Sequence, residues 1–69
     1  MSSEKDTLLW LSLNFKPSLF KIIDALSQVL STTGISEFQK QTIRETLHNA
    51  KYLLKTGNIL QEKLEKQAD

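Results

Sequence analysis

The feature that most constrains this chain is residues 36–67, where apolar residues recur at alternating steps of three and four. Side chains at that spacing lie on one face of an α-helix. Six of the eight positions on this face are apolar. The positions are Ile43, Leu47, Ala50, Leu54, Gly57, Gln61, Leu64 and Ala68. We call this face the seam, and because it would be unstable in water alone, another part of the chain or another molecule must cover it.

Gly57 is the one position of the seam that has no side chain. A glycine inside a helix costs about 0.8–1.0 kcal/mol relative to alanine, so its presence requires a reason. One explanation is that another helix approaches closely at this point, and the other is that the helix ends there. Both predict that Gly57→Ala lowers the stability of the protein.

A second helix is predicted over residues 17–32. Its apolar face consists of Leu19, Ile22, Leu26 and Val29, widened by Ile23 and Leu30. Residues 31–34, Ser-Thr-Thr-Gly, then predict a break. Ser36 followed by Gln39 has the spacing of a reciprocal capping box, which begins the next helix. Because so short a connection places two helices side by side, we expect an antiparallel helical hairpin.

The N-terminal residues 4–14 predict an additional helix. Glu4 and Asp6 lie near its positive end, and the apolar residues that follow leave almost no polar side. The same residues alternate with the period of a strand, but the chain contains no second strand signal, so we prefer a helix. Pro17 predicts that the chain kinks, or stops and restarts, before the next helix. This segment would either fold across the hairpin or pack on another subunit.

Length and composition limit the fold. A chain of 69 residues forms one domain at most, and at that size it buries only about 60% of the surface exposed by the unfolded chain. It has no Cys and one His, so disulfides and clustered metal ligands cannot stabilise it. Self-association is the remaining way to stabilise so small a fold. We therefore predict one all-α domain, residues 1–69, with helices at about 4–14, 17–32 and 36–67, that assembles into a homodimeric helical bundle.

Apolar residues outside the seam predict where a protein partner binds. Three of them lie on the last helix, at intervals of fourteen and seven residues, and form a second apolar edge beside the seam. Four more lie close together in the N-terminal segment. The predicted interface residues are Leu8, Trp10, Leu11, Phe15, Phe38, Tyr52 and Ile59. The expected function is a non-enzymatic protein–protein interaction module: a small regulator, an adaptor or a chaperone-like protein.

A basic stripe is the sharpest polar feature of the last helix. It consists of Lys40, Arg44, His48, Lys51 and Lys55. Like charges one turn apart destabilise an isolated helix, so bound anions would stabilise this one. The alternative function is therefore a nucleic-acid-binding regulator that uses the stripe. Three observations favour an ordinary solvated face instead. Glu37 and Glu62 lie at similar angles around the helix to the stripe, no aromatic residues are interleaved with it, and the net charge of the chain is only +1.

Catalysis has little support in the sequence. His48 has no second His or Cys near it, and the chain has no HExxH motif and no Gly-rich phosphate loop, so we expect neither an enzyme nor a cofactor. His48 followed by Lys51 resembles the phosphate-accepting site of histidine phosphotransfer domains. Tyr52 departs from that pattern, because those domains keep a small residue there. A phosphotransfer-like protein is the lower alternative.

The N-terminal region shows no targeting pattern. Met1 is followed by Glu4, Lys5 and Asp6 rather than by a basic region. The apolar run that follows, residues 8–13, is far shorter than the roughly 20 residues needed to span a membrane. We therefore expect a cytoplasmic protein without a membrane span.

Overall fold

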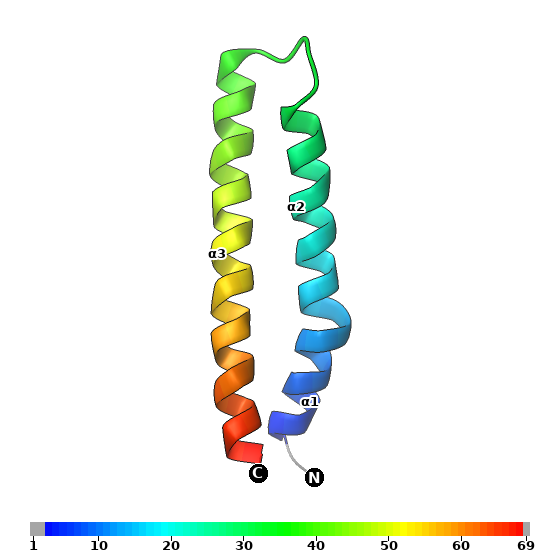
Figure 1. Ribbon diagram of the computed structural model, residues 1–69, viewed down its shortest axis with the longest axis vertical. Helices are drawn as coiled ribbons and strands as arrows, with labels where there is room; N and C mark the ends of the chain where they lie inside the picture. Colours follow the sequence, from blue (N-terminus) through cyan, green and yellow to red (C-terminus); the bar gives the residue numbers. More distant parts are fainter. Residues whose placement is uncertain (1–2, 69) are drawn as a thin grey trace.

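The computed structural model describes residues 3–68 as two antiparallel helical stretches joined by one turn (Figure 1). The first stretch comprises α1 (Ser3–Trp10), a π-helical turn η1 (Leu11–Phe15) and α2 (Lys16–Leu30). The second is α3 (Glu37–Ala68). Both α1 and α2 contact α3, and the first and last described residues lie at the same end of the molecule. The all-α prediction is confirmed, and the strand alternative for the N-terminal segment is wrong.

The turn between α2 and α3 follows the sequence prediction closely. Gly34 has a φ of 87°, a left-handed conformation that glycine adopts without the steric cost of a Cβ. The predicted capping box is present. The Ser36 N–H donates to the Gln39 side-chain oxygen and the Gln39 N–H donates to the Ser36 hydroxyl, both at 3.1 Å. α2 ends at Leu30, slightly earlier than predicted.

Removing the capping hydroxyl tests this turn. Ser36→Ala should lower the free energy of unfolding by about 1 kcal/mol, because the Gln39 N–H in the first turn of α3 loses its acceptor. Thermal melts followed by circular dichroism measure the change. The control is Ser27→Ala, the same substitution at an exposed site inside α2, which should leave stability unchanged or slightly raised. Equal losses in the two variants would contradict a capping role for Ser36.

Burial along α3 confirms the seam. Ala50 is 5% exposed, Gly57 is also buried, and the other predicted members up to Leu64 are partly buried. The side chain of Ala68 lies outside the described part of the chain. All other described α3 side chains are exposed, apart from Lys40, which extends the seam toward the turn. The helix continues through Gly57, and its φ is not positive, so a helix end there is wrong.

The side of α2 that faces α3 differs from the predicted face. The α2 residues turned toward the seam are Leu19, Ile23, Leu26 and Leu30. Ile22 and Val29, which we predicted in the core, are 45% and 44% exposed. A single facing helix covers only about two positions in every seven. One flank of the wide apolar face of α2 therefore remains open.

The N-terminal segment continues into α2 through η1 instead of forming a separate helix, so a stop and restart of the chain at Pro17 is wrong. The reason lies in η1, where the Lys16 N–H donates to the carbonyl oxygen of Leu11, five residues back. In a regular helix Pro17 would remove a hydrogen bond, and its ring would press on the carbonyl four residues back. A wider π-helical turn just before the proline relieves that clash and lets the helix continue.

The same π-helical turn corrects the register of the apolar face. The apolar residues of the first stretch that are not exposed are Leu8, Leu11, Phe15, Leu19, Ile23, Leu26 and Leu30. From Leu8 to Leu30 the chain advances 22 residues, one more than three heptads. η1 contains the additional residue. Leu11, at 2% exposure, and Leu19, at 7%, can therefore both reach the core.

Candidate protein-binding surface

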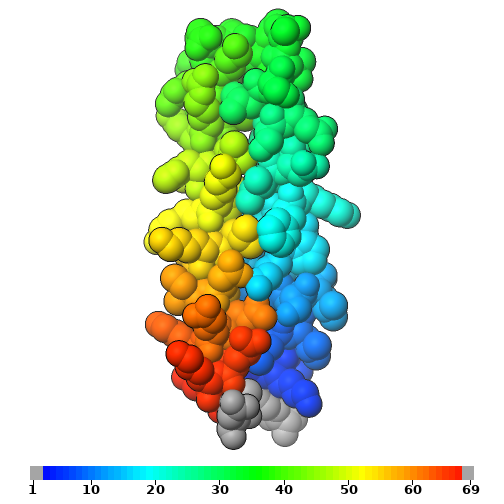
Figure 2. Space-filling view, in the orientation of Figure 1, coloured from blue at the N-terminus to red at the C-terminus, as the bar shows by residue number. Residues whose placement is uncertain are grey.

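The two helices cover each other along a narrow seam only, and the chain is long and thin. It extends 51 × 16 × 13 Å (Figure 2). Its radius of gyration is 15.6 Å, against about 11 Å for a compact chain of this length. Its accessible surface is 5372 Å², whereas a compact monomer of this mass would expose about 4,400 Å². The surplus is comparable to the roughly 800 Å² that each partner buries in a standard interface.

Many large apolar side chains lie on this surface. Within the described residues, only Leu11, Leu19 and Ala50 form the fully buried apolar core. Eleven large apolar residues are at least 43% exposed. They are Leu9, Trp10, Leu13, Phe20, Ile22, Val29, Phe38, Tyr52, Leu53, Ile59 and Leu60. Isolated exposed apolar residues are ordinary, but a continuous patch marks an interface, so their arrangement matters.

Four of these residues share one side of the helix pair. A hollow near the turn is lined by Val29 of α2 and by Gln39 of α3. Each directly precedes a partly buried residue, Leu30 or Lys40, so in this antiparallel pair the two residues flank the packed faces on the same side. Residues seven apart return to the same side of a helix in a coiled pair. That spacing leads from Val29 to Ile22 on α2, and from Gln39 through residue 46 to Leu53 and Leu60 on α3.

This side carries no charge over most of its length, and we call it the uncharged face. It comprises Ser18, Ile22, Ala25 and Val29 of α2, and Gln39, Thr42, Thr46, Asn49, Leu53, Thr56 and Leu60 of α3. None of the eight Lys, Arg, Asp and Glu residues between positions 17 and 60 belongs to it. Its four large aliphatic residues are 43–48% exposed. Such residues at the edge of a seam form a second surface on which a helix can dock.

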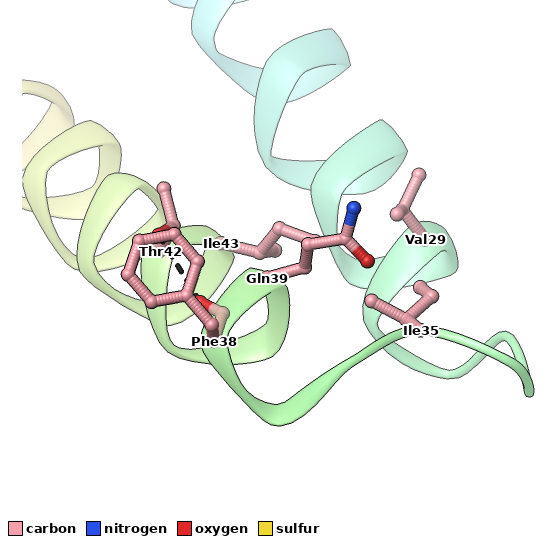
Figure 3. Close-up of a pocket in the computed structure, with 6 residues that line it drawn as sticks. All are labelled: Val29, Ile35, Phe38, Gln39, Thr42 and Ile43. Atoms are coloured by element: carbon pink, nitrogen blue, oxygen red, sulfur yellow. Dashed lines mark hydrogen bonds between the residues drawn. The ribbon is translucent and has the colours of Figure 1, made fainter.

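The hollow lies at the turn end of this face (Figure 3). Its volume is about 360 Å³, and its lining residues are Val29, Ile35, Phe38, Gln39, Thr42 and Ile43. In Figure 3, Phe38 and Thr42 lie on α3, across from Val29 and Ile35. The Thr42 hydroxyl donates to the Phe38 carbonyl oxygen at 3.2 Å, so its donor is satisfied within the helix. The hollow can therefore accept an apolar side chain.

Three of the four predicted interface residues in the N-terminal segment pack within the chain. Leu11 is 2% exposed, and Leu8 and Phe15 are partly buried. α1 and η1 both contact α3, so this segment covers the seam in the same molecule. Trp10 is the exception, at 52% exposure, with its ring centroid 5.3 Å from that of Phe15.

The three predicted interface residues of α3 are exposed. Phe38 is 81%, Tyr52 65% and Ile59 46% exposed. Tyr52 and Ile59 immediately precede Leu53 and Leu60 in the chain, so this second edge borders the uncharged face. Sequence reasoning did not assign the four aliphatic residues of that face to an interface: it placed Ile22 and Val29 in the core and did not single out Leu53 and Leu60. The signal that could have found them is the absence of charge at these seven-residue positions.

Gly57 lies against the first helical stretch, with no space for a side chain between them. A Cβ added there would overlap Cε2 of the Phe15 ring and lie only 3.0 Å from Cδ2. The explanation by close approach therefore holds, although the group that approaches is an aromatic side chain of η1 and not a helix backbone. The π-helical turn places Phe15 at this position, where the Trp10 ring flanks it.

The basic stripe is not uniform. Lys40 belongs to the seam, with a side chain 30% exposed and its Nζ 3.7 Å from a carboxylate oxygen of Glu37. The other members, Arg44, His48, Lys51 and Lys55, are exposed. His48 lies in a shallow polar depression that α3 forms alone. Among residues 3–68, no three His, Asp or Glu side chains form a group that could hold a metal ion.

Comparison with known proteins gives no match, whether to a protein family, to a curated protein or to a solved structure. Within the described residues, none of the helices has the length and apolar character that crossing a bilayer requires.

Proposed function

We propose that this chain is a non-enzymatic protein–protein interaction module that acts through its apolar helix faces. In this proposal it is a small regulator, an adaptor or a chaperone-like protein, and it works as a homodimer. The observation that carries the proposal is the surplus of exposed surface, since in the described part of the chain eleven large apolar side chains are open to water while three apolar residues form the buried core. A cytoplasmic location stays a prediction from the sequence.

The exposed apolar surface would stabilise a complex with a partner that covers it. Burying apolar area contributes about 25 cal/mol per Å² removed from water, so half-exposed Ile, Leu and Val side chains represent stabilisation that the isolated chain leaves unrealised. A docked helix would cover them without rearranging the seam. Nothing comparable supports catalysis, because the groups around His48 come from one helix and do not converge from two sides.

Photo-crosslinking in the source cell tests this proposal. Benzoylphenylalanine placed at position 53, in the uncharged face, should give covalent adducts with protein. The matched control places it at position 51, two residues away on the basic stripe, where few adducts are expected. The proposal fails if position 53 yields no protein adduct, with this chain or any other.

The alternative proposal, a nucleic-acid-binding regulator, rests on the exposed side chains of Arg44, Lys51 and Lys55. If these three side chains and Lys40 neutralised four phosphates, affinity for duplex DNA would fall about 100-fold between 50 and 200 mM salt, because each neutralised phosphate releases counterions. Apolar docking would not weaken in this way. We favour protein binding because Lys40 belongs to the seam and pairs with Glu37. The phosphotransfer-like alternative stays a prediction from His48 and Lys51.

A further inference from the structure

We infer that the uncharged face is the contact between two copies of this chain, which pack through it as a four-helix bundle. The inference rests on the proposed function and assigns it a partner and a surface. The central contacts are made by Ile22 and Val29 of α2 and by Leu53 and Leu60 of α3. The basic stripe and the Tyr52 side chain remain outside the contact.

The number of apolar positions per heptad supports a bundle. Two helices that pack only on each other need two apolar positions in every seven, whereas helices of a bundle need about three. In α2 the third position is occupied by Ile22 and Val29, and in the C-terminal half of α3 by Leu53 and Leu60. All four are 43–48% exposed. The third apolar position of each heptad is therefore present in both helices and is exposed to water in a single chain.

The absence of charge points to a second copy rather than to an unlike partner. Symmetric dimers present the same surface on both subunits, so any charged residue near the two-fold axis meets its own like charge. A face with no Lys, Arg, Asp or Glu from position 18 to position 60 avoids that repulsion. It also offers no charge by which an oppositely charged partner could be selected.

The area also agrees with a pair of copies. The chain exposes 5372 Å², about 1,000 Å² more than a compact monomer of its mass. A standard interface removes about 800 Å² from each partner. Two copies side by side would therefore bring the surface of each chain close to that of an ordinary globular protein. The hollow at Val29 and Ile35 gives this contact a place for an apolar side chain of the second copy.

Sedimentation equilibrium of the purified chain tests the inference. The wild type should be a dimer, and Leu53→Lys and Ile22→Lys should each weaken dimerisation on the order of a thousandfold, since an interface centre typically loses about 30-fold per site and symmetry places each change there twice. Tyr52→Lys is the matched control, because Tyr52 is the neighbouring residue, is 65% exposed and lies outside the face. It should leave the dimer intact. Lysine has nearly the helix propensity of leucine, so helicity should persist in Leu53→Lys.

A second measurement decides the case if a lysine variant does not fold. The chain has no Cys, so Ile22→Cys and Tyr52→Cys each carry one thiol. As protein concentration rises, maleimide should react more slowly with Ile22→Cys, while Tyr52→Cys should react at a constant rate. Protection of Tyr52→Cys alone, or loss of the dimer only in Tyr52→Lys, would overturn the assigned surface. A wild type that stays monomeric while position 53 crosslinks to other proteins would overturn the homodimer and the second copy as partner, and would leave the protein–protein interaction function standing.

Discussion

Gly57→Ala should lower the free energy of unfolding by about 1 kcal/mol, although alanine is the better helix former. The new methyl group would overlap the Phe15 ring, and overpacking of this kind typically costs about 1–3 kcal/mol. The gain in helix propensity offsets only about 0.8–1.0 kcal/mol of that cost. For a domain of this size, thermal melts should show a fall of roughly 4–8 °C for each kcal/mol lost.

The decisive control for Gly57→Ala is the same substitution without the aromatic ring. In a Phe15→Ala background there is no ring for the methyl group to meet, so Gly57→Ala should now stabilise the chain by up to about 1 kcal/mol. The sign of the effect therefore reverses between the two backgrounds. If alanine at position 57 raised the melting temperature with Phe15 in place, the close packing of η1 on α3 would be refuted.

Leu11→Ala should have the largest effect of any single truncation, about 2–5 kcal/mol of unfolding free energy. Leu11 is 2% exposed and is the largest fully buried side chain of the described residues. Chains of this length have a total stability of about 3–10 kcal/mol, so the variant should be partly unfolded near room temperature. Urea unfolding followed by circular dichroism measures the loss.

Leu13→Ala is the matched control for Leu11→Ala. Leu13 lies in the same π-helical turn but is 69% exposed, and truncating it should change stability by no more than about 0.5 kcal/mol. Similar small losses at both positions would show that the N-terminal segment does not pack on α3 in its own chain. Similar large losses would show that Leu13 is buried in an assembly.

The helices and the turn could be predicted from the sequence because their causes are local. The period of three and four residues located α3 and the seam, and Ser36 with Gln39 located its first turn through hydrogen bonds that span three residues. These signals depend on neighbours within one or two helical turns. Burial then follows the predicted seam along α3, position by position, up to Leu64.

Tertiary packing decided the path of the N-terminal segment. Pro17 predicts a kink or a break on local grounds, and the helix continues through it because a π-helical turn holds one additional residue and keeps both Leu11 and Leu19 buried. The count of 22 residues from Leu8 to Leu30 contains this information. The additional residue can be recognised in this count only when α3 is known to lie beside the whole stretch, so that every apolar residue from Leu8 to Leu30 must face it.

Packing also decided which side of α2 is core. Residue spacing alone predicts that α2 has a wide apolar face and that the seam lies on α3. It could not say whether Ile22 and Val29 or Ile23 and Leu30 would be covered, because both pairs lie on that face. One facing helix covers a narrow stripe, and its position decided that Ile23 and Leu30 are packed against α3 while Ile22 and Val29 remain 45% and 44% exposed.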